Sequence, residues 1–198
     1  MAAASVTVPQ AEMPLSPAMR GKVGMWCLIV AESSIFCIFV VAYLYYAGKS
    51  VSGPTPAQVL HVPIFASICL FSSSLTIVLS EKAIHRGNIK QFGIFWFLTL
   101  ALGVIFLVET GIEWHRLIYN EGLTISTNLF GTTYYSLVGL HAFHVTVGAI
   151  GLTIILLFTL FGAVKMEHAG RIGVFAMYWH FVDAIWVVVL SVVYFIAR

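Results

Sequence analysis

The sequence predicts an all-α membrane protein: a bundle of five transmembrane helices with a cytoplasmic N-terminus and a periplasmic C-terminus. Hydrophobic residues make up 60% of the 198 residues, charged residues only 9%, and the mean hydropathy is +0.98. Soluble globular domains carry about 25% charged residues. Because a spanning helix needs about 20 mostly apolar residues, a chain of this length has room for about five or six spans with short loops.

Five long apolar segments are separated by breaks rich in Gly, Pro and charged residues, which are typical of loops. The predicted spans are residues 23–46, 62–79, 92–114, 134–161 and 172–196. Residues 1–21 are polar and rich in Ala and Pro, and they lack the basic-then-apolar order of a signal peptide. We expect residues 1–21 to form a disordered cytoplasmic tail, and residues 22–198 to form the five-helix transmembrane domain.

The distribution of Lys and Arg predicts the orientation, because short cytoplasmic loops carry an excess of these residues. With the N-terminus inside, seven of the ten basic residues lie on the cytoplasmic side. Only Lys49, Arg116 and Arg198 then lie outside. The N-terminus is therefore expected in the cytoplasm.

Composition also disfavours several classes of function. The formal net charge is only +2, and the basic residues lie at the ends of apolar segments, so no nucleic-acid partner is expected. Cys27, Cys37 and Cys69 are isolated within apolar segments, without the Cys or His spacing of a metal site. The chain also lacks GxSxG, P-loop and HExxH motifs. We expect no catalytic residue and no metal ligand in this chain.

Five ionisable residues lie inside the predicted spans, where such groups are costly and mark candidate functional sites. They are Glu32 in the first span, His141 and His144 in the fourth, and His180 and Asp183 in the fifth. At the rise of an α-helix, all five lie about 10 to 17 Å from the ends of their spans. Residues three apart share a helix face. The sequence therefore permits a polar cluster between the first, fourth and fifth spans.

Two interpretations of these residues remain open. The structural one is that they only hydrogen-bond helices together. The functional one concerns Glu32 above all, since a carboxyl group at mid-membrane is a candidate for reaction with an apolar carbodiimide. Glu109 and Glu113 lie near the outer end of the third span and are expected to be outer-side, water-facing carboxylates. Histidines on adjacent helices at similar depth could also supply the two axial ligands of a haem.

Three segments resemble subunit III of haem–copper terminal oxidases, that is, cytochrome c and quinol oxidases. They are GMWCLIVAESSIFCIF at 24–39, FGTTYYSLVGLHAFHVTVG at 130–148 and YWHFVDAIWVVV at 178–189. The pattern Gly-x-His-x-x-His-Val and the pattern Trp-His-Phe-x-Asp-x-x-Trp occur in that family in this order. ETGIEW at 109–114 stands where the family carries an acidic and aromatic segment. The likeness covers essentially residues 22–198 and is to the bacterial five-helix form.

The resemblance implies an accessory subunit with no redox centre of its own, bound directly to oxidase subunit I and assembled with subunit II and other oxidase subunits. The haems and copper would belong to those partners. In the family, subunit III protects the core during turnover, supports proton uptake and holds structural phospholipids. Glu32 matches the family's buried carboxyl. The seven-helix mitochondrial type has two additional helices that form a lipid cleft, and this chain carries no counterpart of them.

Other functions remain open at this point. Within the same family lies the subunit III-like protein of nitric oxide reductases. From other classes come a free-standing haem b or quinone-binding electron carrier and a small proton-coupled transporter. A transporter would be favoured by inverted repeats, which the sequence does not show. A haem carrier would show a visible absorption spectrum when the chain is isolated.

Overall fold

The computed structural model describes residues 17–50 and 52–196, which fold almost entirely into helices. The elements in chain order are α1 (Pro17–Tyr46), α2 (Pro56–Val59), α3 (Ile64–His85), α4 (Ile89–Tyr119), α5 (Leu129–Leu160), the 3-10 turn η1 (Met166–His168), α6 (Ala169–Ser191) and the π-helical turn η2 (Val192–Ile196). Five of these helices are long and apolar enough to cross a membrane. The predicted all-helical class and the predicted number of spans are confirmed.

α4 and α5 begin earlier than the predicted spans at 92 and 134, because capping residues precede the apolar segments. Asn88 accepts a hydrogen bond from the Gln91 backbone N–H at the start of α4, and Asn128 accepts one from the Gly131 N–H at the start of α5. Asn is among the most favourable residues at a helix N-cap. α1 begins at Pro17, so the end of the predicted tail is helical. Residues 1–16, which make up the rest of that tail, lie outside the described residues.

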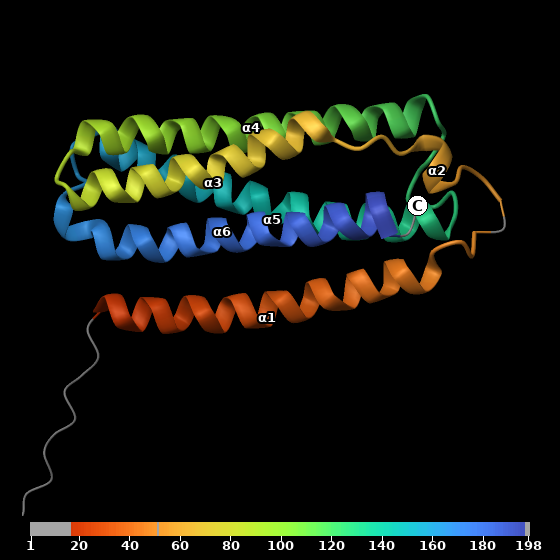
Figure 1. The fold of residues 1–198 in the computed structure, drawn as a ribbon, viewed down its shortest axis with the longest axis horizontal. Helices are drawn as coiled ribbons and strands as arrows, with labels where there is room; N and C mark the ends of the chain where they lie inside the picture. The colour runs from red at the N-terminus through yellow and green to blue at the C-terminus, as the bar shows by residue number, and fades with distance from the viewer. Residues whose placement is uncertain (1–16, 51, 197–198) are drawn as a thin grey trace, which may run out of the picture.

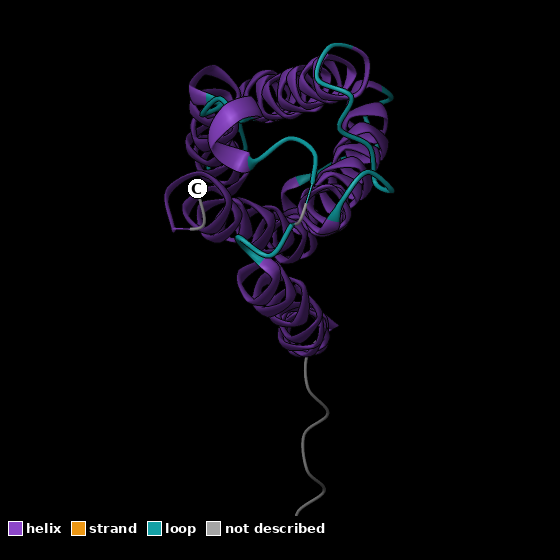
Figure 2. Cartoon of the chain, turned by 90° about the vertical axis from the view of Figure 1, so that its right-hand side faces the viewer, coloured by secondary structure: helices purple, strands orange, loops and turns teal. Residues whose placement is uncertain are grey.

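The long helices run side by side, and α1 lies at the margin of the bundle (Figure 1). Seen along the helix axes, α3 to α6 form a group of four, and α1 packs outside it (Figure 2). Its contacts are mainly with α5 and α6. Only 11% of the most apolar window of α1 is buried, compared with 50% for the span that contains α6. α6 is therefore the most buried of the long helices, and most of the α1 surface is exposed.

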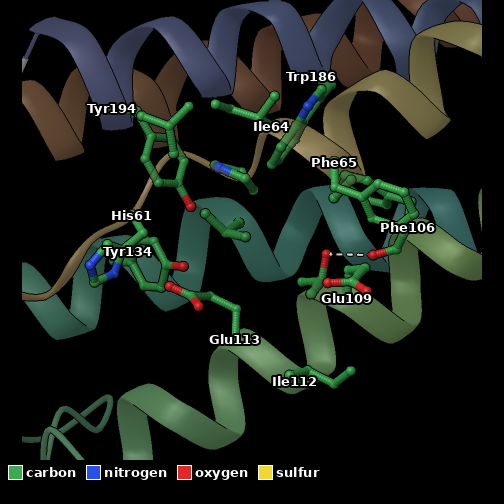
Figure 3. Close-up of a pocket in the computed structure, with 15 residues that line it drawn as sticks. His61, Ile64, Phe65, Phe106, Glu109, Ile112, Glu113, Tyr134, Trp186 and Tyr194 are labelled. Carbon is green, nitrogen blue, oxygen red and sulfur yellow. Dashed lines mark hydrogen bonds between the residues drawn. The ribbon is translucent and has the colours of Figure 1, made fainter.

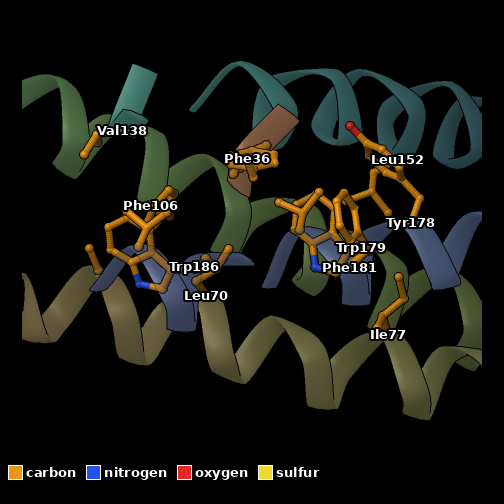
Figure 4. Packing of buried hydrophobic residues seen from close by; sticks show 14 of the residues in the cluster. Phe36, Leu70, Ile77, Phe106, Val138, Leu152, Tyr178, Trp179, Phe181 and Trp186 are labelled. Carbon is orange, nitrogen blue, oxygen red and sulfur yellow. The ribbon is translucent and has the colours of Figure 1, made fainter. Parts of the chain in front are cut away.

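Tryptophans on α4 and α6 organise the interior, and Figure 4 shows the two on α6, Trp179 and Trp186, among the buried side chains. Three of their indole N–H groups donate across a helix interface: Trp96 to the Leu152 carbonyl, Trp179 to Ser73 and Trp186 to Ser67. Apolar burial drives helix association only weakly in lipid, so close packing and such hydrogen bonds hold transmembrane bundles together. The three indoles therefore tie α4 to α5 and α6 to α3.

Trp179 lies between two glycines of neighbouring helices. A Cβ atom added at Gly103 of α4 would lie 2.7 Å from the indole, and one added at Gly148 of α5 would lie 2.8 Å from it. Only residues without a side chain leave room for the ring at these two positions. The glycines thus set how closely α4 and α5 approach α6.

Polar contacts also fasten the loops at the end of the bundle that carries α2, called here the α2 end. Arg116 donates to the Val59 carbonyl at 2.7 Å, which ties α2 to the last turn of α4. The Asn128 amide donates to the carbonyls of Ser52 and Pro54. The connection between α1 and α3 is thereby held against the chain that enters α5.

Candidate functional site

Glu32 of α1 meets His144 of α5 inside the bundle. The distance between His144 Nε2 and Glu32 Oε2 is 3.1 Å, and His144 Nδ1 lies 2.8 Å from the Leu140 carbonyl oxygen. Since a carbonyl oxygen can only accept, Nδ1 must carry a hydrogen. The contact between Nε2 and the carboxyl group then needs a second proton, held by either Glu32 or His144. The contact between Glu32 and His144 is therefore a hydrogen bond between α1 and α5.

Neighbouring side chains enclose His144 and leave the Glu32 carboxyl group partly exposed. The ring of Phe36, one turn beyond Glu32 on α1, lies 5.0 Å from the His144 ring between centroids. Tyr178 of α6 donates to the His144 backbone carbonyl at 3.1 Å. The exposed fraction is 8% for the His144 side chain and 24% for that of Glu32. The carboxyl group can therefore be reached from the α1 side while the imidazole is enclosed.

The second polar contact joins α3 to α6. Ser74 donates its hydroxyl hydrogen to the Asp183 carboxylate. The Ser74 hydroxyl oxygen also lies 3.3 Å from His180 Nδ1. Asp183 is 5% exposed, so this hydrogen bond is shielded from the surroundings. Ser74 of α3 therefore contacts both His180 and Asp183, which lie on one face of α6.

Ser74 is the partner that sequence reasoning missed. For the run of serines at 72–74 the natural expectation is a bond to a backbone carbonyl one turn back. Ser73 does bond to the Leu70 carbonyl, at 2.6 Å. Ser74 instead turns to α6. The only sequence signal was the run itself, which does not tell which hydroxyl faces another helix.

His141 lies in a third environment. Its ring stacks on Trp186 at 5.0 Å between centroids and meets the edge of Phe106 at 5.7 Å. The residue is fully buried, and neither ring nitrogen hydrogen-bonds to any residue that the structure describes. The five ionisable residues of the expected cluster are therefore divided: Glu32 pairs with His144, Asp183 and His180 share Ser74, and His141 packs among aromatic rings.

Glu109 and Glu113 line a cavity of about 310 Å³ at the α2 end (Figure 3). Glu113 forms an ion pair with Arg116, which also reaches Glu121 at 3.4 Å. Glu109 makes no hydrogen bond or ion pair with the described part of the chain. The two expected outer-side carboxylates thus differ, since one is neutralised by a cation and the other is not.

No group of three or more His, Cys, Asp or Glu side chains converges as metal ligands would within residues 17–50 and 52–196. Both ring nitrogens of His144 already have hydrogen-bond partners, and aromatic side chains enclose His141. The arrangement is that of interhelical polar contacts.

Comparison with known proteins agrees with this picture. The family model described as "Cytochrome c oxidase subunit III" matches residues 16–198. The chain is 32% identical to cytochrome c oxidase subunit 3 of Alkalihalophilus pseudofirmus, over 91% of this chain and 90% of that one. It is 37% identical to cytochrome c oxidase subunit 3 of a Synechocystis species, over 86% and 73%, and 27% identical to quinol oxidase subunit 3 of Bacillus subtilis, over 86% and 84%. The chain therefore belongs to the cytochrome c oxidase subunit III family, the subunits III of the haem–copper oxidases.

Proposed function

We propose that this chain is a non-catalytic subunit of a bacterial haem–copper oxidase, which reduces oxygen to water and moves protons across the inner membrane. The match to subunit III over nearly the whole chain supports this assignment, and the five apolar helices fit it. Its partners are oxidase subunit I, bound directly, and subunit II. Structural phospholipids complete the assembly.

The haems and copper belong to the partner subunits in this proposal. Within the bundle, the two ring nitrogens of His144 hydrogen-bond to Glu32 and to the Leu140 carbonyl, and His180 Nδ1 lies beside the Ser74 hydroxyl. A haem between two helices needs two free axial nitrogens facing a space as wide as the macrocycle. His144 and His180 instead lie against hydrogen-bond partners, and His141 packs against the rings of Phe106 and Trp186. The geometry thus favours a supporting subunit over a free-standing haem carrier.

The proposed role of this chain is to stabilise subunit I and to support proton uptake. α1 leaves most of its apolar surface exposed, and the Glu32 side chain on this helix is 24% exposed. A carboxyl group held by His144 and reachable from that face can contact a partner helix or lipid. We expect an apolar carbodiimide to label Glu32, and this labelling to disappear in Glu32→Gln.

The proposed orientation places the N-terminus in the cytoplasm and the C-terminus in the periplasm. It rests on the bias of Lys and Arg towards the loops on one side. Single cysteines at Ser52 and Gly87, in a background without the native cysteines, lie in loops at opposite ends of the bundle. An impermeant thiol reagent added from the periplasm should label the first and spare the second. Labelling of Gly87→Cys alone would reverse the orientation.

Purification through a tag on this chain tests the function. After mild solubilisation, a large haem-bearing subunit should copurify, and a reduced-minus-oxidised spectrum should show its haems. Deletion of the chain should leave an oxidase with its haem spectrum and initial activity, which then loses activity faster during turnover and takes up protons more slowly. Recovery of the chain alone, with near one iron per chain, would overturn the proposal in favour of a haem carrier.

A further inference from the structure

His180 lies at the centre of a transmembrane helix, with one ring nitrogen facing out of the bundle. It is the middle residue of α6 (Ala169–Ser191), about 16 Å from either end at the rise of an α-helix. Its Nδ1 lies beside the Ser74 hydroxyl, whereas its Nε2 makes no hydrogen bond to the residues that the structure describes. The residue is partly exposed, and Nε2 is not enclosed by the bundle. The imidazole therefore presents an unpaired nitrogen to its surroundings at mid-membrane.

The contact inside the bundle fixes what this nitrogen can bind. The Ser74 hydroxyl gives its hydrogen to Asp183, so its oxygen can only accept a hydrogen bond from His180 Nδ1. With the N–H at Nδ1, the Nε2 atom of a neutral imidazole is a hydrogen-bond acceptor. An acceptor that faces hydrocarbon without a donor is unfavourable. His180 therefore calls for a hydrogen-bond donor from outside this chain.

The depth of His180 decides where that donor comes from. Lipid chains carry no hydrogen-bonding groups, and the headgroups lie at the edges of a hydrocarbon core about 30 Å thick. Water is excluded from that core. Hydroxyl and amide side chains, by contrast, form hydrogen bonds between transmembrane helices. The donor for Nε2 is therefore a side chain on another membrane-spanning segment.

The surface around His180 suits the approach of a helix. Figure 1 shows α6 between α3 and α1, and α6 packs against both. The exposed or partly exposed positions of α6 that share the face of His180 recur every three or four residues, the spacing at which helices pack side by side. They are Gly173, Met177, His180, Ala184, Val187 and Ser191. The small residues among them let another helix come close, and a hollow of about 200 Å³ between α1 and α6 leaves room for one of its side chains.

We propose that this face of α6, centred on His180, is the docking surface for a transmembrane helix of a different subunit, whose hydroxyl, amide or indole group donates a hydrogen bond to Nε2. A second copy of this chain does not meet the requirement. In a symmetric pair the face would meet itself, and Met177, Ala184 and Val187, its other residues near that depth, have no side-chain donor. The inference rests on the proposed place of this chain in a multisubunit assembly.

Photocrosslinking in the assembly purified through a tag on this chain tests the surface. Benzoylphenylalanine is placed at Val187, which lies two turns from His180 on the same face and is 49% exposed. Val104 is the matched control, because it is the middle residue of α4, is 43% exposed and lies on a helix that packs against α3 and α5. Irradiation should link Val187, but not Val104, to a different membrane subunit. Absence of a protein adduct at Val187, the same adduct at Val104, or an adduct of two copies of this chain would overturn the proposal.

Substitutions at the polar contact separate docking from folding. His180→Leu and Ser74→Ala both remove the hydrogen bond between α3 and α6, but only His180→Leu removes Nε2. At a detergent concentration that keeps half of the wild-type assembly intact, His180→Leu should lower the yield of the Val187 adduct at least about fivefold. Ser74→Ala should retain most of the adduct, as should His180→Gln, whose amide oxygen can accept the same hydrogen bond. Equal losses in His180→Leu and Ser74→Ala would confine His180 to the fold of this chain and overturn the docking role.

Two further readouts keep the result unambiguous. Should His180→Leu fail to fold, the comparison of Val187 with Val104 in the otherwise native chain decides the question. Copurification of a haem-bearing subunit tests the oxidase assignment separately. An adduct at Val187 without any haem-bearing partner would refute the assignment and keep the docking surface, whereas a haem-bearing partner without an adduct at Val187 would do the reverse.

Discussion

A single methyl group at Gly148 tests whether close approach of α5 to α6 holds the bundle together. In Gly148→Ala, the new Cβ would lie 2.8 and 2.9 Å from two ring carbons of Trp179. The ring cannot move away easily, because it is fully buried, because Gly103 bounds it on the other side and because its N–H is bonded to Ser73 at 2.9 Å. Either the helices must separate or the indole must leave its position.

The expected cost follows from packing. Overpacking a tight interior costs about 1 to 3 kcal/mol. Because the Trp179 ring cannot move away, we expect the packing cost of Gly148→Ala to be about 3 kcal/mol. Alanine also gains about 1 kcal/mol over glycine through helix propensity. Gly111 of α4 provides the matched control, since an added Cβ there has no neighbour within 4 Å. The propensity gain is common to both substitutions, so the two variants should differ in unfolding free energy by the packing cost of about 3 kcal/mol.

The measurement is a titration of the purified chain from mild detergent into sodium dodecyl sulfate, followed by circular dichroism. Gly111→Ala should unfold at or above the wild-type midpoint, and Gly148→Ala well below it. A cycle with Trp179→Phe, which shortens the ring, should recover part of the loss because the two changes share one contact. Equal midpoints for Gly148→Ala and Gly111→Ala would refute the packing argument.

The polar contacts between helices can be tested in the same way. Glu32→Gln keeps a hydrogen-bonding group opposite His144 and should assemble normally, whereas Glu32→Ala leaves the imidazole unpaired at a cost of about 1 to 3 kcal/mol. Copurification of the partner subunits measures this, and equal assembly of both variants would contradict it. Ser74→Ala removes the hydrogen bond from α3 to the α6 carboxylate and should lower the unfolding free energy by about 1 to 3 kcal/mol. Ser72→Ala, the control in the same serine run, should change it by less than about 0.5 kcal/mol, and a similar loss in both would argue against the α3 to α6 contact.

Local properties of the chain were sufficient for the number and positions of the spans. The thickness of a bilayer sets the length of a spanning helix, and hydropathy is read from consecutive residues. The predicted spans therefore agree with the long helices apart from their ends, where Asn88 and Asn128 cap α4 and α5 earlier. The two patterns that surround His144 and Asp183 were also sufficient to indicate the family. The orientation of the chain in the membrane stays a prediction.

Tertiary structure alone decided which polar residues meet. A span that is apolar on all sides has no amphipathic face to show which side packs against a neighbour. The sequence showed that the five ionisable residues lie at similar depths in the membrane, but it did not show which residues Glu32 and His141 contact. The rotation of each helix comes from packing, as where Gly103 and Gly148 receive the Trp179 ring. That rotation brings Glu32 to His144, turns Ser74 towards Asp183 and leaves His141 among aromatic rings. Residues far apart in the chain enclose the cavity beside Glu109 for the same reason, because a space between four helices exists only once they have packed.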